Sequence, residues 1–145
     1  MYVKVKDDEP KTYSLEQLRQ DNPETSFPAF PDEKLLAQWD VYPCTILPKP
    51  NYNSLTEKLS AASVSKVDKV WTQGWNIERL SLIEAEQNIR QKRDQLLFET
   101  DWVVIKATEL GQPLPLNWVA YRQDLRDITS QSDFPYSVIW PTKPE

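Results

Sequence analysis

The spacing of apolar and polar residues predicts short strands in the first half of the chain. Residues 2–6 alternate between the two kinds, as a strand with one buried face does. Residues 7–10, Asp-Asp-Glu-Pro, are then expected to form an acidic turn. Valines alternate with polar residues over 63–80, which predicts a pair of strands. Either Asp68-Lys69 or Gly74 can provide the turn between them, and the pattern does not choose.

Two short helices are expected near the start of the chain. Ser14 and Gln17 form a capping box, which predicts a helix over 15–20. Asp32 is a typical N-cap for a second helix over 33–39. Both segments carry apolar residues at three- and four-residue spacings, so each helix is expected to bury one side.

The segment 41–50 contains three prolines and the chain's one cysteine. Because proline cannot donate a backbone hydrogen bond, Thr45-Ile46-Leu47 is expected to be at best an edge strand. Cys44 cannot form a disulfide within the chain, so the fold does not depend on an oxidising compartment. Cys44 can therefore either be buried as a small apolar side chain or form a disulfide between subunits, and the sequence leaves both roles open.

A second capping box, Ser81 with Glu84, predicts the start of the longest helix, which meets no glycine or proline before Gly111. Apolar residues recur in it every seven positions, at Leu82, Ile89, Leu96 and Val103. One such seam makes a weak coiled coil. The stripe either docks on its own domain or binds a partner, including a second copy through residues 82–103. The charged residues between Glu84 and Arg93 leave little apolar surface for docking at home.

The C-terminal part is expected to be an αα-hairpin followed by an extended aromatic tail. Gly111 to Pro115 is a turn, and apolar spacing predicts a helix over 116–128. Across the hairpin two groups are expected to meet: Leu96, Leu97 and Trp102 on one side, and Trp118, Tyr121 and Leu125 on the other. The tail, 134–141, is too apolar to be free and should lie along a groove or on a partner.

These elements predict an α+β fold. A small, irregular antiparallel β-rich domain with a strand pair is expected over 1–80. A long helix, the αα-hairpin and the aromatic tail are expected over 81–145.

Composition narrows the function. The net charge of -5 offers no positive face for nucleic acid or an anionic membrane. No apolar run approaches the roughly 18 residues of a bilayer span, and the first residues lack the apolar centre of a signal peptide. The product is therefore expected to stay in the cell that makes it.

The chain also lacks the residues that most chemistry needs. It has no histidine and only two glycines, which argues against nucleophile triads, zinc sites and dinucleotide folds, so no metal or cofactor is expected. The acidic turn lacks the ligand spacing of a calcium loop. A hydrolase with two carboxylates is the surviving enzyme class. Glu99 and Asp101 are a poor pair for it, because residues two apart on a helix point in different directions. We therefore expect no enzyme.

Trp71 and Trp75 allow a different function. Exposed tryptophans on a small sheet can stack on a sugar, which would make the protein an adhesin-like module of the virion that binds a host glycan. In a small sheet with few aliphatic residues, the same tryptophans more often form the core.

The C-terminal third resembles a known family. Residues 93–102, Arg-Asp-Gln-Leu-Leu-Phe-Glu-Thr-Asp-Trp, are followed by a spacer with prolines. Residues 118–127, Trp-Val-Ala-Tyr-Arg-Gln-Asp-Leu-Arg-Asp, come next. These two runs are similar to the signature of phage tail assembly chaperones. The middle of the chain, with Trp-Thr-Gln-Gly-Trp at 71–75, resembles the region before this module in phage tail-fibre-associated proteins.

The resemblance implies a bacteriophage protein that helps a tail or tail fibre to assemble by binding a tail-fibre, baseplate or other tail protein, and it brings no catalytic residues. It implies action in the host cytoplasm during assembly, and retention in the virion as a structural connector stays open. The residues expected to contact the partner are Leu82, Ile89, Leu96, Leu97, Trp102, Trp118, Tyr121, Phe134, Tyr136 and Trp140. The first half of the long helix and the aromatic tail are the favoured binding regions.

Overall fold

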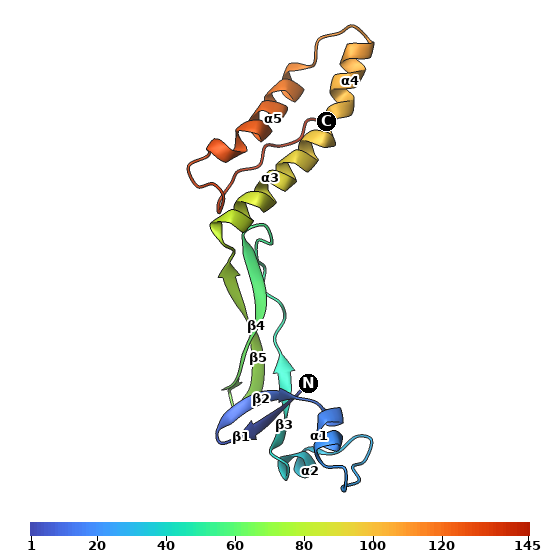
Figure 1. Ribbon diagram of the computed structural model, residues 1–145, viewed down its shortest axis with the longest axis vertical. Coiled ribbons are helices and arrows are strands. Elements are labelled where there is room, and N and C mark those ends of the chain that lie inside the picture. Colours follow the sequence, from blue (N-terminus) through green and yellow to red (C-terminus); the bar gives the residue numbers. More distant parts are fainter. The chain divides into compact units, whose positions relative to one another are not determined.

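The computed structural model describes residues 1–145 and divides into two compact units. The first unit comprises Met1–Tyr52 and Leu59–Ile77, and the second comprises Asn53–Lys58 and Glu78–Glu145. Strands are concentrated in the first unit and helices in the second, so the expected α+β class is confirmed. Figure 1 shows the elements of both units. None of the helices has the length and apolar character that a bilayer crossing requires.

The first unit begins with a β-hairpin and two short helices. The hairpin pairs β1 (Tyr2–Lys6) with β2 (Glu9–Tyr13), and the helices are α1 (Leu15–Asp21) and α2 (Glu33–Ala37). The capping box of Ser14 and the N-cap of Asp32 are both present, as expected. The expected four-residue acidic turn is wrong, because the turn is only Asp7-Asp8 and the next five residues form β2. Both aspartates have positive φ, the conformation that a two-residue hairpin turn requires.

The sheet has five strands in the order β2-β1-β3-β5-β4. The three remaining strands are β3 (Val41–Ile46), β4 (Glu57–Val67) and β5 (Val70–Arg79). The expectation of an edge strand at 45–47 is wrong, since β3 is the central strand and ends at Ile46. Its first half pairs antiparallel with β1 and its second half pairs parallel with β5. The sheet is therefore not purely antiparallel. Two of the three prolines, at 48 and 50, lie beyond the strand and remove no donor from it.

The predicted strand pair is confirmed as β4 and β5. Of the two turns left open by the sequence, Asp68-Lys69 is the one used. Both residues have positive φ, whereas Gly74 lies inside β5. The core of this unit has two buried clusters. One contains Val3, Cys44 and Val64, and the other contains Leu18, Leu36 and Val41.

The second unit consists mainly of four helical segments. They are α3 (Leu82–Phe98), α4 (Asp101–Glu109), α5 (Leu116–Arg126) and the short 3-10 helix η1 (Asp127–Ser130). The predicted capping box of Ser81 begins α3. The expected long helix is confirmed over residues 82–109, but it is bent: α3 ends at Phe98 and α4 starts after a break at Glu99-Thr100. The residues after η1 run back along the helices (Figure 1).

Candidate binding surface of the C-terminal hairpin

The first half of α3 is held by its own unit. Ala85 and Ile89 are fully buried. The Asn88 side chain donates a hydrogen bond of 3.1 Å to the carbonyl of Leu55. The sequence suggested too little apolar surface to hold this half at home. Two buried apolar side chains and one amide hydrogen bond provide the missing contacts.

The break between α3 and α4 is organised by Arg122 from α5. Its guanidinium donates to the Leu97 carbonyl at 2.9 Å, to Thr100 Oγ1 at 2.6 Å and to Asp101 Oδ1 at 2.8 Å. Thr100 is fully buried, and its hydroxyl in turn donates to the carbonyls of Leu96 and Leu97. These bonds add side-chain donors to carbonyls in the last turn of α3, where the regular helical hydrogen bonds end. Arg122 therefore fixes the place where the long helix bends.

Aromatic rings form the centre of the hairpin. Trp102 and Trp118 meet edge to face, with ring centroids 6.4 Å apart, and Trp118 meets Tyr121 in the same way at 6.1 Å. The buried cluster is Val103, Trp118, Tyr121 and Leu125, with Leu96 and Leu97 packed against it. Burial raises the pKa of the Tyr121 hydroxyl. The contacts expected across the hairpin are confirmed.

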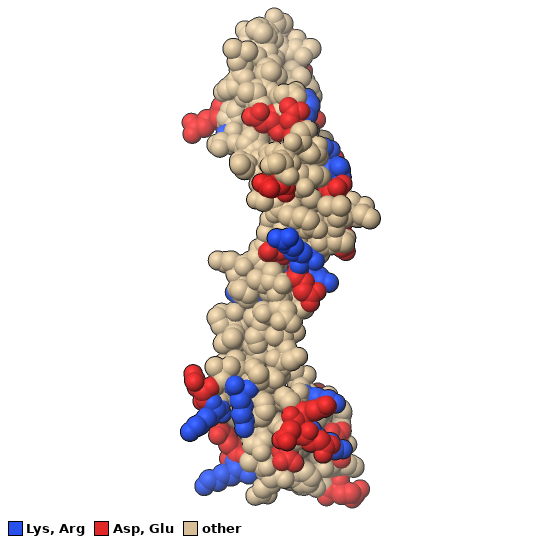
Figure 2. Space-filling view, turned by 90° about the vertical axis from the view of Figure 1, so that its left-hand side faces the viewer, with Lys and Arg blue, Asp and Glu red and all other residues tan.

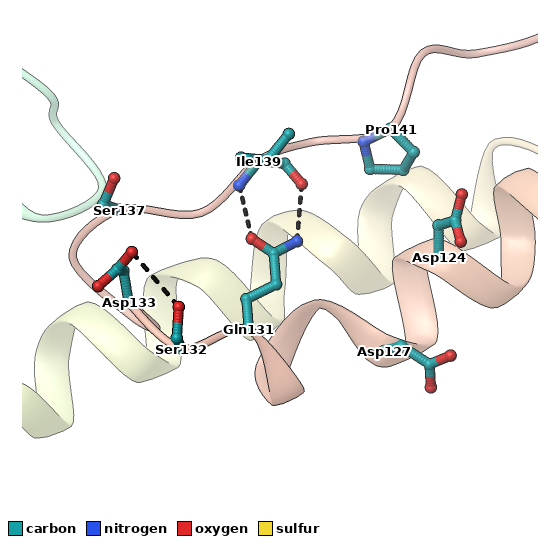
Figure 3. Close-up of a pocket in the computed structure, with 8 residues that line it drawn as sticks. All are labelled: Asp124, Asp127, Gln131, Ser132, Asp133, Ser137, Ile139 and Pro141. Carbon is teal, nitrogen blue, oxygen red and sulfur yellow. Dashed lines mark hydrogen bonds between the residues drawn. The ribbon is translucent and has the colours of Figure 1, made fainter.

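The aromatic tail lies on its own unit rather than extending into solvent. Tyr136 donates to the Leu80 carbonyl at 3.1 Å, and the guanidinium of Arg90 lies 5.3 Å from the centre of the Phe134 ring. Figure 3 shows how the side-chain amide of Gln131 holds the tail. It accepts from the Ile139 N–H at 2.7 Å and donates to the Ile139 carbonyl at 2.8 Å, as a neighbouring strand would.

The pocket drawn in Figure 3 has a volume of about 610 Å³, and most of the residues that line it have polar side chains. Its acidic side chains are Asp124, Asp127 and Asp133. Across the chain, no group of three or more His, Cys, Asp or Glu side chains is arranged to hold a metal ion.

The ten residues expected to contact a partner differ in exposure. Leu82 and Trp102 are each 55% exposed. Three are buried, namely Ile89, Trp118 and Tyr121. Five are partly buried: Leu96, Leu97, Phe134, Tyr136 and Trp140. Four residues form the seam that repeats every seven positions, and three of them are used within their own unit. Ile89 and Val103 are buried there, and Leu96 packs against the hairpin core. Association through this seam stays a prediction that rests mainly on Leu82.

Other large apolar side chains lie at the hairpin surface and were not singled out from the sequence. Phe98, at the end of α3, is 77% exposed, and Ile105, three residues after Trp102 on α4, is 56% exposed. Leu110, Leu116 and Val119 are exposed as well. We call these six side chains the hairpin patch: Phe98, Trp102, Ile105, Leu110, Leu116 and Val119. Figure 2 shows that the end of the hairpin, where α4 leads to α5, is free of charged side chains on the face in view.

The tryptophans of the first unit are occupied by contacts within that unit. Trp71 packs against the cluster of Val3, Cys44 and Val64, with Lys66 Nζ 4.8 Å from its ring centre. The indole N–H of Trp75 donates to the Leu47 carbonyl at 2.8 Å, and Lys49 Nζ lies 5.3 Å from its ring centre. A sugar that stacked on either ring would have to displace a lysine from the face it covers.

Cys44 and the carboxylates that the sequence raised for chemistry have structural surroundings. Cys44 is a buried free thiol, and burial raises its pKa, so it is a weak nucleophile and poorly placed for a bridge between subunits. Asp101 accepts from Arg122, and Glu99 accepts from the Gln95 side chain. The geometry therefore gives no cleft between the two carboxylates.

Comparison with known proteins agrees with the resemblance found in the sequence. The model of the family described as phage tail assembly chaperone protein matches residues 86–145, which include most of α3, the whole hairpin and the tail. No curated protein and no solved structure gives a significant match. The family describes an assembly role rather than a catalytic one. Residues 86–145 are thus similar to the phage tail assembly chaperone family, and this similarity supports a role in the assembly of a phage tail.

Proposed function

We propose that this chain binds another tail protein, such as a tail-fibre or baseplate protein, through the hairpin patch and so assists its assembly. The observation that carries this proposal is the exposure of six large apolar side chains in the region that matches the family. Soluble proteins seldom leave such side chains close together without a partner. Action in the host cytoplasm during tail assembly belongs to the same proposal.

The burial pattern supports the exposed residues of this region, rather than its buried motif residues, as the contact surface. Three residues of the signature are used inside the hairpin: Arg122 holds the bend, and Trp118 and Tyr121 form the core. Aromatic and aliphatic side chains that desolvate at the centre of an interface supply most of its binding free energy. Phe98, Trp102 and Ile105 have the size and exposure for that role.

The proposal is tested with an affinity-tagged chain expressed during phage infection. A phage tail protein should co-purify with the unmodified chain, and Phe98→Ser combined with Ile105→Ser should abolish that co-purification. Phe30→Ser is the matched control, because Phe30 is 93% exposed but lies in the first unit. Capture of a tail protein by all three chains alike would show that the patch is not the contact surface.

Retention in the virion is a separate part of the proposal. A chain that stays on its partner as a connector should be present at a fixed ratio to that partner in purified particles. Quantitative mass spectrometry of mature particles measures this ratio. Presence in infected cells together with absence from particles would establish a transient chaperone and exclude the connector.

A further inference from the structure

A loop joins α1 to α2 (Figure 1), and Phe30 projects from it into solvent. At 93% exposure, Phe30 is the most exposed of the chain's large apolar side chains. A single exposed apolar side chain is common on protein surfaces and by itself indicates nothing. Phe30 is distinguished by the backbone that carries it and by a cavity elsewhere in the chain that is suited to receive it.

The backbone around Phe30 is held in place by contacts within the first unit. The guanidinium of Arg19 donates to the carbonyls of Pro28 and Ala29, at 3.0 and 3.1 Å. Phe27 meets the ring of Trp39 edge to face, with ring centroids 5.3 Å apart. Prolines in the loop restrict φ as well. The loop is therefore preorganised, and a side chain on a rigid loop loses little conformational entropy when it enters a binding site.

The second unit contains an aromatic cavity in its hairpin, which we call the Trp102 cavity. It has a volume of about 510 Å³, and its walls are α4, the connection from α4 to α5, and residues 143–145. The rings of Trp102 and Trp118 stand at 69° to each other in one wall. Leu110 and three prolines add apolar lining. Protein pockets that bury small molecules have volumes of roughly 300–1,000 Å³, so this cavity has room for one aromatic side chain.

The charges around the loop and around the cavity have opposite signs. Residues 19–34 carry four carboxylates against two cations, which gives a net charge of -2. The charged side chains that line the cavity are Lys106, Lys143 and Glu145, which together carry a net charge of +1. Neither lysine forms an ion pair within the chain. The loop and the cavity are therefore complementary in polarity and in charge.

We propose that Phe30 of one copy of this chain inserts into the Trp102 cavity of a second copy. Such a contact is heterologous, because it joins two different surfaces of the same chain. Its anchor is an aromatic side chain that loses its water in an apolar pocket, as the residues that dominate binding free energy do. Trp102 and Leu110 belong to the hairpin patch as well, so a seated second copy covers part of that patch before a tail protein binds. The inference goes beyond the proposed function and does not depend on it.

The test mixes two full-length variants that can form only one such contact. The acceptor, labelled with ¹⁵N, carries Phe30→Ser and keeps its cavity. The unlabelled donor keeps Phe30 and carries Ala107→Glu, which places a long charged side chain in the cavity wall. Glutamate is a good helix former, so α4 should be retained. One inserted side chain makes a weak contact, so donor is added up to about 1 mM. The indole N–H signals of Trp102 and Trp118 in the acceptor should shift along a one-to-one binding curve.

Two further donors test the anchor and the charges separately. A donor that also carries Phe30→Ser should bind about 10- to 150-fold more weakly, because it loses the burial of one aromatic side chain. A donor with Glu24→Lys and Glu33→Lys should bind about 2- to 5-fold more weakly, and Lys106→Glu in the acceptor should recover most of that loss.

Three results would overturn the proposal: equal shifts with and without Phe30 in the donor, no shift with the intact donor, or further weakening by Lys106→Glu. The substituted side chains of the loop are all exposed, so these variants should keep the fold of the first unit. No tail protein is present in the mixtures. A negative result would therefore refute this inference and leave the proposed function standing.

Discussion

Replacement of Arg122 by methionine is the most informative single change in the hairpin. Methionine keeps much of the side-chain volume but removes all three hydrogen bonds of the guanidinium. Arg122 is buried, with only 8% of the residue exposed. A hydrogen bond that involves a charged group contributes about 1.5–3 kcal/mol when it is buried. The bond to Asp101 is worth less, at most about 1 kcal/mol, because that carboxylate is half exposed.

We expect Arg122→Met to lower the free energy of unfolding of the hairpin by about 3–6 kcal/mol, the sum for its two buried hydrogen bonds. Most of the loss should come from the bonds to the Leu97 carbonyl and Thr100 Oγ1, so Asp101→Asn should cost less than about 1 kcal/mol. Urea unfolding followed by circular dichroism at 222 nm measures both values. Arg126→Met is the control, since Arg126 is exposed on the same helix and should change stability by no more than about 0.5 kcal/mol.

The reasoning would be refuted by two results. One is a loss below about 0.5 kcal/mol for Arg122→Met, which would mean that the bend does not depend on the guanidinium. The other is an equal loss for Arg122→Met and Asp101→Asn, which would place the whole effect in the partly exposed ion pair.

Three further predictions concern single contacts. Gln131→Ala should cost about 1 kcal/mol and speed hydrogen exchange at the Ile139 amide, whereas Ser132→Ala should leave that exchange unchanged. Ser81→Ala should destabilise α3 by about 1 kcal/mol, measured by thermal unfolding. Unchanged stability would mean that the capping box does not stabilise the helix. Burial, together with a hydrogen bond to a neighbouring carboxylate, raises the pKa of Tyr13 to about 12 from its ordinary value of 10.0. The contribution of this raised pKa to the free energy of unfolding is fully present below pH 10.0 and is lost as the pH rises toward about 12. The urea midpoint of the unmodified chain should fall over that interval, and Tyr13→Phe should reduce this fall.

Features that depend on neighbouring residues were predictable from the sequence. The capping boxes of Ser14 and Ser81 join groups three residues apart, and both are present. The turn at Asp68-Lys69 was one of two candidates, and only the backbone conformation separates it from Gly74. These features follow from local chemistry, which a sequence displays directly.

Features that depend on distant residues were not predictable. The central position of β3 results from its parallel pairing with β5, in which Cys44 lies opposite Trp71. The break after Phe98 is held by Arg122, whose partners lie more than twenty residues away in sequence. Heptad spacing alone gives no sign of either contact, because both are fixed by tertiary packing.

The candidate site was predictable only in part. The hairpin contacts and the internal role of Trp118 followed from helical spacing and were confirmed. The exposed residues Phe98 and Ile105 were missed, although their spacing from Trp102 was visible in the sequence. Apolar spacing predicts a helix face, but it does not tell whether that face is covered by the same chain or by a partner.

The central claim is that the hairpin patch binds a tail protein, and the most direct test is the affinity for the purified tail protein that the chain captures. Burial of each large apolar side chain is worth about 1.5–3 kcal/mol. Isothermal titration calorimetry should therefore show a loss of at least about 100-fold for Phe98→Ser with Ile105→Ser, at 1.4 kcal/mol for each tenfold change. Phe30→Ser should stay within about 2-fold of the unmodified chain. An unchanged Kd for the double variant would contradict the account.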